Sequence, residues 1–181
     1  MTSKNSITPF DQYASYAEAR EDMDDCCDLI GEGASGRAYA PNIYSNWIVR
    51  ISERWGSYEE YVTRVQEMEC RLTPEIRYIK RFDGGGALVI LERLNTDMLR
   101  HPTELRRAFR SMWRCRRQKS SYNERALKHL DARNVRLADI ELLFDVIEDV
   151  LATDGVGKFD VSGQNVGFRQ NGEMVVFDPV S

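Results

Sequence analysis

The sequence predicts an α+β fold in which a five-stranded antiparallel sheet with one main helix is followed by a reduced, mostly helical half. Short apolar runs bounded by glycine, proline and asparagine dominate residues 27–92, as expected for strands joined by turns. Apolar residues at helical spacing dominate residues 103–151. Near the C-terminus Asn171–Gly172, a strong hairpin signal, separates two further apolar runs.

Length and composition favour one domain with a sizeable core. The chain has 181 residues, of which 42% are apolar and 30% charged, as in ordinary soluble proteins. Its net charge of −4 does not favour binding to nucleic acid or anionic membranes. No apolar run is long enough for a membrane span or a secretory signal. The four cysteines lack a Cys-x-x-Cys pair, so reduced thiols in a cytoplasm are expected rather than a zinc site.

The first 26 residues are expected to form an N-terminal helical segment. Thr8-Pro-Phe-Asp11 combines a hydroxyl cap, a proline at the first helical position and an acid in the first turn. A helix is therefore predicted from there to about Asp22. Residues 18–28 are acidic, which is typical of a solvated surface, with a docking patch for a basic partner as the alternative.

The next stretch carries a G-x-G-x-x-G triplet at Gly31, Gly33 and Gly36. Before a helix such a triplet is a dinucleotide-binding turn, whereas between two strands it is a flap whose backbone amides cover phosphates. Pro41 would break a following helix, and no strand further on ends in the acid that a ribose contact requires. The hairpin flap is favoured, with a glycine-rich turn that binds nothing as the alternative.

A strand over residues 46–52 places one cation, Arg50, within an apolar run. A buried cation needs a partner, either the phosphate tail under the flap or a carboxylate on the next helix. The candidate carboxylates are Glu60, Glu67 and Glu69.

That next helix is capped by Ser57 and expected from Tyr58 to about Arg71. Residues 75–82 alternate as a half-buried strand, and residues 87–92 form a continuous apolar one after a glycine turn. These two strands complete the predicted five-stranded sheet.

The second half is expected to contain two helices. The first is capped by Thr103 and runs through Lys119, and the second, central one covers Asp139 to Leu151. Outside its apolar side the first is strongly basic, which suits an acidic protein, a phosphorylated peptide or nucleic acid; the alternative is a solvated face. Its cations are Arg106, Arg107, Arg110, Arg114, Arg116, Arg117 and Lys119.

The closing stretch carries Asp160, Asn165 five residues later and Asp178 thirteen beyond that. In kinases a first acid faces the attacking hydroxyl, while an asparagine and a second acid hold magnesium on the triphosphate. The hairpin across Asn171–Gly172 should place Asn165 and Asp178 at the same end of one ribbon, close enough to share an ion. Loop capping would explain any one of these residues, but the set indicates a phosphate-and-metal site.

In this order the parts resemble a eukaryotic-type protein kinase from Leu29 to Asp178. Residues 30–39 look like its glycine-rich loop, 48–51 like its lysine strand, and 88–94 like the hinge strand and connector that hold adenine. More closely, residues 159–165 and 178–181 resemble the early serine/threonine protein kinase of autographiviruses, small bacteriophages that carry their own RNA polymerase. Those enzymes act on host transcription and RNA-processing proteins.

The resemblance implies a kinase-like N-lobe over residues 27–92 and a minimal C-lobe over residues 93–181, which ends after the metal-binding acid. It also implies a role for each matched position. Asp160 and Arg50 would be catalytic, Gly31, Gly33, Gly36, Arg50 and Glu92 would bind ATP, and Asn165 and Asp178 would bind Mg²⁺.

The chain also departs from the kinase pattern. Arg50 stands at the lysine position, and its planar guanidinium group does not replace the compact ammonium group of a lysine. Lys158–Phe159 replaces His-Arg, Ser162 stands where many of these kinases have lysine, and Pro179 replaces Phe-Gly. No activation segment follows Asp178 within these residues.

Two functions are therefore expected as alternatives. One is a phage-encoded serine/threonine kinase that acts on host proteins in the host cytoplasm, with its target docked on the basic helix Arg106–Lys119. The other is a catalytically impaired kinase-fold protein that binds and inhibits a host factor. An aminoglycoside-type phosphotransferase shares the Asp-x4-Asn and later Asp pattern and is a third possibility.

Overall fold

The structure is a computed structural model that describes residues 9–33, 36–42, 45–96, 102–154, 158–161 and 165–180. It divides into two compact units. Unit 1 is Met1–Glu59 with Ile76–Arg93, and unit 2 is Glu60–Glu75 with Leu94–Ser181. Among the described helices, none has the length and apolar character needed to cross a lipid bilayer.

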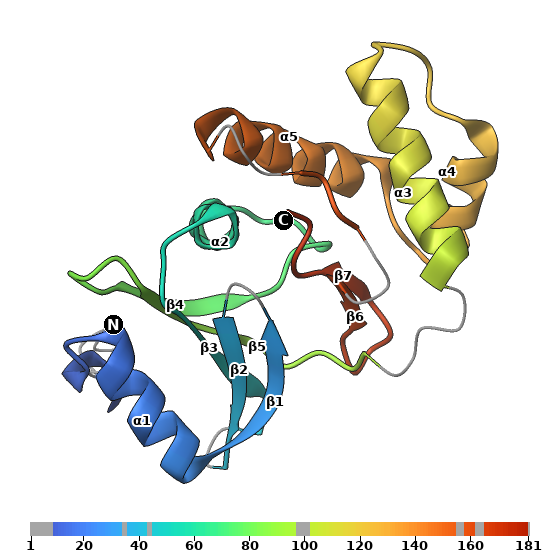
Figure 1. The fold of residues 1–181 in the computed structure, drawn as a ribbon. Helices are drawn as coiled ribbons and strands as arrows, with labels where there is room; N and C mark the ends of the chain where they lie inside the picture. The colour runs from blue at the N-terminus through green and yellow to red at the C-terminus, as the bar shows by residue number, and fades with distance from the viewer. Residues whose placement is uncertain are drawn as a thin grey trace, which may run out of the picture. The chain divides into compact units, whose positions relative to one another are not determined.

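Unit 1 is built on the five-stranded antiparallel sheet that the sequence predicts, in the order β1-β2-β3-β5-β4 (Figure 1). The α+β expectation is thereby confirmed, because the apolar runs and turns of residues 27–92 form consecutive antiparallel pairs. The strands are β1 (Cys27–Gly33), β2 (Gly36–Pro41), β3 (Trp47–Ser52), β4 (Ile76–Arg81) and β5 (Ala87–Glu92).

The N-terminal segment differs from the single helix expected from Thr8 to Asp22. Instead a short 3₁₀ turn, η1 (Pro9–Gln12), precedes helix α1 (Tyr16–Cys26). The Ser15 Oγ accepts the Glu18 N–H at 3.3 Å, and the Glu18 carboxylate accepts the Ala14 N–H at 2.7 Å. This nearly reciprocal cap fixes the start of α1. Thr8, the expected cap, lies outside the described residues.

Helix α1 covers one face of the sheet in unit 1 (Figure 1). Its Ala19 and Met23 are buried together with Val49 and Ile51 of β3. Because side chains alternate along a strand, Arg50 between those two points to the opposite face. Helix α2 (Ser57–Gln66) begins in unit 1 and continues into unit 2.

Unit 2 is mostly helical, as expected, with a small two-stranded ribbon (Figure 1). Helix α4 is not among the predicted elements; Asn123 caps it by accepting the Ala126 N–H at 3.1 Å. The available signal was an asparagine cap ahead of Ala126 and Leu130, which are buried at a helical spacing of four. The elements are α3 (Pro102–Arg117), α4 (Glu124–Asp131), α5 (Leu137–Asp154), β6 (Val166–Phe168) and β7 (Met174–Val176).

Helix α2 ends at Gln66 rather than at about Arg71. The chain leaves the helix because the Leu72 carbonyl accepts the Val176 N–H at 2.7 Å, which ties residues 70–73 to the ribbon. The Tyr61 hydroxyl donates to the carbonyl of the same Val176 at 2.8 Å. Tertiary pairing thus overrides the helical periodicity of this stretch.

Candidate functional site

The predicted site residues fall into two groups, one on each unit. The acid, amide and acid of the closing stretch belong to unit 2. The glycine triplet, Arg50 and Glu92 belong to unit 1. Their roles stay predictions, and Ser162 lies outside the described residues.

Backbone pairing brings the three residues of unit 2 onto two facing chain segments. The Asp160 N–H donates to the Pro179 carbonyl at 2.8 Å, and the Phe177 N–H donates to the Asn165 carbonyl at 2.9 Å. Asp178 lies between these two points of attachment. All three side chains belong to half-buried residues, so a ligand can reach them from solvent.

The Asn165 side chain is held in one orientation. Its Nδ2 donates to the Asp160 carbonyl at 2.7 Å. Because an amide has one donor end and one acceptor end, Oδ1 is the atom that Asn165 can offer to a cation. The same contact fixes the loop that carries the Asp160 carboxylate.

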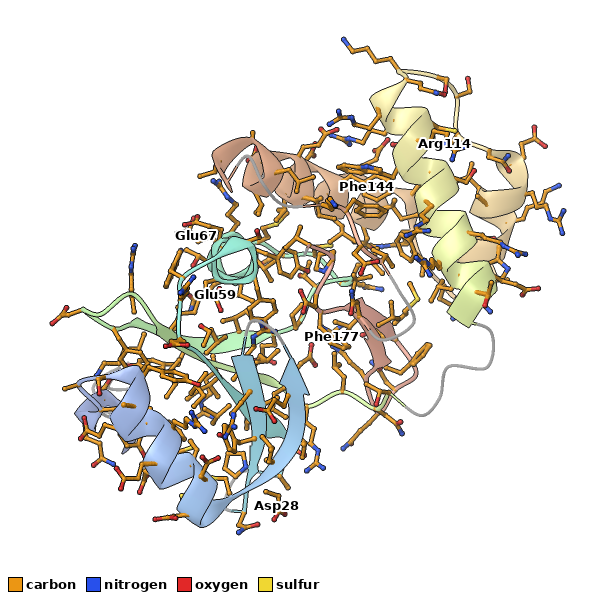
Figure 2. The ribbon with its side chains drawn as sticks, viewed as in Figure 1. Asp28, Glu59, Glu67, Arg114, Phe144 and Phe177 are labelled. Atoms are coloured by element: carbon orange, nitrogen blue, oxygen red, sulfur yellow. The ribbon has the colours of Figure 1, made fainter. Side chains whose placement is uncertain are left out.

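An aromatic cluster holds Phe159, the residue that precedes Asp160. The Phe159 ring stacks on Trp113 of α3 with ring centroids 4.6 Å apart and planes 12° apart. Phe144 of α5, labelled in Figure 2, meets both rings edge-on. Apolar packing thus holds the residue that precedes Asp160. Nothing in the local sequence identifies these partners, since Trp113 and Phe144 belong to separate helices.

Asn165 and Asp178 suit a cation that arrives with its own further ligands. Both offer oxygen, the donor atom that Mg²⁺ prefers, and Mg²⁺ usually keeps several waters and substrate phosphates. No group of three or more His, Cys, Asp or Glu side chains is placed to hold a metal within the part of the chain that the structure describes.

The three glycines of the triplet lie on the β1–β2 hairpin in unit 1, as the flap interpretation predicts. Gly33 pairs with Gly36 at its tip, and a Cβ on Gly33 would meet nothing within 4 Å. A Cβ on Gly36 would lie 2.5 Å from the Ile51 carbonyl oxygen of β3. Gly36 is thus required by the sheet itself, whereas Gly31 and Gly33 leave room for a ligand to approach the backbone.

An ion-pair network attaches this hairpin to α1. Arg37 of β2 binds Glu32 across the hairpin at 2.8 Å and Asp24 of α1 at 3.1 Å. The Tyr39 hydroxyl donates to Asp24 at 2.7 Å. The pKa of Asp24 is lowered, first by this hydrogen bond and then by the positive charge of Arg37. The acids of residues 18–28 are exposed, as a solvated surface predicts, and Asp24 in addition helps to position the hairpin.

Arg50 has an aromatic neighbour, Tyr58, which the sequence pattern does not predict. Its guanidinium carbon lies 3.5 Å from the centroid of the Tyr58 ring, at the start of α2. On β3 it stands opposite Ala38 of β2 and Val89 of β5, in the middle of the sheet. The remaining predicted position, Glu92, pairs with Trp47 at the end of β5.

No protein-family model and no curated protein matches the chain. Among solved structures, a thermostable mutant of aminoglycoside phosphotransferase APH(4)-Ia is 18% identical with a TM-score of 0.31, over 48% of this chain and 31% of that one. Aminoglycoside phosphotransferase APH(4)-Ia itself is 20% identical with a TM-score of 0.33, over 54% and 36%. The streptomycin–ATP–APH(2")-IIa ternary complex is 13% identical with a TM-score of 0.36, over 90% and 72%.

The chain thus spans about a third of the length of the first two of these structures. At such TM-scores the similarity does not establish a shared function. The functional assignment rests on the geometry of the chain's own residues.

Proposed function

We propose that the chain is a phage-encoded serine/threonine protein kinase that transfers the γ-phosphate of ATP to host proteins and so modulates host transcription or RNA processing. The observation that carries this proposal is the clamp of the Asn165 amide on the Asp160 carbonyl, at 2.7 Å. It presents a carboxylate and an amide oxygen from one short loop, with Asp178 on the paired segment. Phosphoryl transfer needs such a set because its catalysis is mainly positioning and charge stabilisation.

Each group would have a defined task. The Asp160 carboxylate orients the substrate hydroxyl and accepts its proton as the oxygen attacks the γ-phosphorus. The bond from that phosphorus to the β-phosphate oxygen breaks, and ADP leaves. Oδ1 of Asn165 and the Asp178 carboxylate would hold Mg²⁺, which neutralises charge on the phosphates when bound.

The residues of unit 1 would bind the nucleotide. Backbone amides near Gly31 and Gly33 would cover the phosphates, and the Arg50 guanidinium would add a positive charge to them. Glu92, at the end of β5, stands at the position that resembles the hinge and would contact adenine. The network of Arg37 with Asp24 and Glu32 would keep the hairpin in place for this role.

Labelled γ-phosphate tests the proposal. Wild-type protein should label itself or proteins of a host lysate, whereas Asp160→Ala and Asp178→Ala should not. Asp131→Ala, an exposed carboxylate at the end of α4, is the matched control and should label as wild type does. Equal labelling by all four proteins would contradict the assignment.

The second candidate is a catalytically impaired kinase-fold protein that binds and inhibits a host factor. Arg50 favours it, because the planar guanidinium at this position does not replace the compact ammonium of a lysine. This candidate predicts ATP binding without labelling. Host-factor capture would then be the same for wild type and Asp160→Ala.

A further inference from the structure

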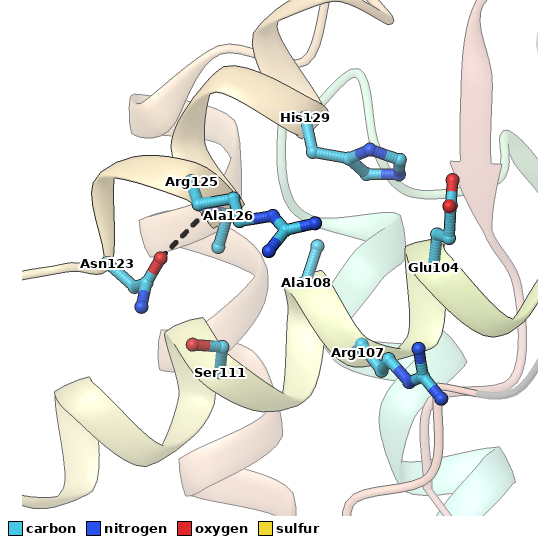
Figure 3. Close-up of a pocket in the computed structure, with 8 residues that line it drawn as sticks. All are labelled: Glu104, Arg107, Ala108, Ser111, Asn123, Arg125, Ala126 and His129. Carbon is cyan, nitrogen blue, oxygen red and sulfur yellow. Dashed lines mark hydrogen bonds between the residues drawn. The ribbon is translucent and has the colours of Figure 1, made fainter.

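A polar groove lies between helices α3 and α4, wholly within unit 2 and on residues that the proposed phosphotransfer does not use. Its volume is about 340 Å³, near the lower end for small-ligand pockets, which begin at roughly 300 Å³. Buried Ala108 and Ala126 help to line it. The polar side chains that line it are Glu104, Arg107, Ser111, Asn123, Arg125 and His129 (Figure 3).

Positive charge predominates in this groove. Arg107 and Arg125 approach from different helices, and the Arg125 guanidinium extends from α4 toward Ala108 of α3 (Figure 3). Glu104 supplies one carboxylate at the end of the groove near His129. Among the described residues neither arginine forms an ion pair, whereas Arg116 of the same basic helix binds Asp145 and Glu148 of α5. The two arginines can therefore accept an anion from outside the chain.

Neutral donors stand at the other end of the groove. The Asn123 Oδ1 accepts the Ala126 N–H at 3.1 Å, so its Nδ2 is the end that can donate to a ligand. Ser111 adds a half-buried hydroxyl. Two guanidinium forks with an amide and a hydroxyl suit a group that has several acceptor oxygens, and a phosphate monoester has three.

We propose that this groove binds a phosphorylated serine or threonine side chain of an acidic partner polypeptide. Arg110, exposed on α3 outside the groove, extends the positive field toward the residues that would flank the phosphate. Nucleic acid fits less well, because none of the described residues that line the groove is a phenylalanine, tyrosine or tryptophan for base stacking. The inference holds whether or not the chain transfers phosphate.

Fluorescence anisotropy with the full chain tests the proposal, using a labelled peptide with one phosphoserine among glutamates and its unphosphorylated counterpart. The double variant Arg107→Gln/Arg125→Gln should bind the phosphopeptide about tenfold more weakly or worse, since it loses charge-assisted hydrogen bonds. The control Arg106→Gln/Lys128→Gln removes the same charge from the same two helices outside the groove. It should stay within about twofold of wild type, because neither Arg106 nor Lys128 lines the groove and isolated exposed charges contribute little.

Further binding measurements distinguish a phosphopeptide from free phosphoserine and from RNA as the source of the phosphate. The unphosphorylated peptide should bind much more weakly, and free phosphoserine or a single-stranded RNA should compete poorly. If both double variants bound the phosphopeptide equally weakly, binding would depend on the overall positive charge of the two helices and not on the groove. That result would overturn the proposal. Binding of free phosphoserine or RNA as tight as that of the phosphopeptide would also overturn it, as would no binding of the phosphopeptide. Equal melting temperatures of the two double variants would exclude unfolding as the cause of a difference.

Discussion

The Arg50 guanidinium is stacked on the Tyr58 ring, with 3.5 Å between its central carbon and the ring centroid. Tyr58 is 5% exposed, so the contact is largely shielded from water. A desolvated cation–π pair contributes about 2 kcal/mol. Stacking occupies the flat face of the guanidinium, while its N–H donors point outward in the plane of the fork. The ring can therefore hold Arg50 without preventing an edge-on approach to phosphate.

Tyr58→Leu should lower the free energy of unfolding by about 2 kcal/mol, since it removes the stacking and part of the packing. It should also reduce the rise in melting temperature that MgATP produces, because an unsupported Arg50 loses its orientation. Tyr58→Phe is the matched control and should keep both values close to wild type. If Tyr58→Leu responded to MgATP as wild type does, the ring would have no part in nucleotide binding.

Two glycines of the same hairpin should respond differently to an added methyl group. Gly36→Ala puts a Cβ 2.5 Å from the Ile51 carbonyl oxygen, so β2 and β3 must separate locally. We expect a loss of roughly 1–3 kcal/mol of stability in denaturant unfolding, as for other overpacked sites. Gly33→Ala meets nothing within 4 Å and should unfold like wild type.

The same pair separates folding from ligand binding. If backbone amides near Gly33 cover phosphates, Gly33→Ala should weaken MgATP binding in calorimetry while its stability is unchanged. If Gly33→Ala bound MgATP with the affinity of wild type, the glycine triplet would serve only as a structural turn.

We expect the Asn165 side chain to have two roles: its Nδ2 holds the loop through the Asp160 carbonyl, and its Oδ1 binds the cation. Asn165→Ala removes the 2.7 Å hydrogen bond to the Asp160 carbonyl and the Oδ1 oxygen together. Asn165→Asp keeps an oxygen but cannot donate, so it separates the two roles. Wild type should melt at a higher temperature with ATP and Mg²⁺ than with ATP and EDTA. Both variants should lose about 1 kcal/mol of stability, the usual contribution of one hydrogen bond.

The two substitutions should then differ in their response to Mg²⁺. The difference between Mg²⁺ and EDTA should vanish in Asn165→Ala and persist in Asn165→Asp. A response of Asn165→Ala equal to that of wild type would assign the cation to other residues.

The strands were predictable because their signal is local. A continuous apolar run between a glycine turn and Glu92 gave β5 its observed bounds, Ala87–Glu92. Other contacts join residues that no local pattern connects. Asp24 meets Arg37 thirteen positions later, and which of the acids in that segment does so depends on how α1 lies on the sheet. The contact of Arg50 with the Tyr58 ring is another such case, because an aromatic neighbour of a cation leaves no pattern in the local sequence.

Within the site, sequence order predicted that Asn165 and Asp178 would lie at the same end of one ribbon, because a tight hairpin joins them. Sequence order did not reveal what supports them. That support is the stacking of Phe159 on Trp113, a residue 46 positions earlier in the chain. The stacking depends on the packing of α3 against the loop.

Phe159 should determine both the stability and the activity of this loop. Phe159→Ala removes a stacked ring with centroids 4.6 Å from Trp113 and should destabilise the protein by about 3 kcal/mol. Phe159→Leu retains apolar volume and should lose less. A double-mutant cycle with Trp113→Leu should give a coupling energy of about 1 kcal/mol, as expected for residues in contact. Additive effects would mean that the two rings do not support each other.

The functional consequence follows from the chain, since Asp160 is the next residue and its N–H is bound to the Pro179 carbonyl at 2.8 Å. A loop that loses the stacked ring holds its carboxylate less firmly, and misplacement of a catalytic group lowers the rate steeply. Under conditions where Phe159→Ala is still folded, its labelling by γ-phosphate should fall far more than its ATP affinity, because the proposed function assigns the glycine and Arg50 contacts of the nucleotide to unit 1. Equal loss of the two would indicate general unfolding, and unchanged labelling would separate the aromatic cluster from catalysis.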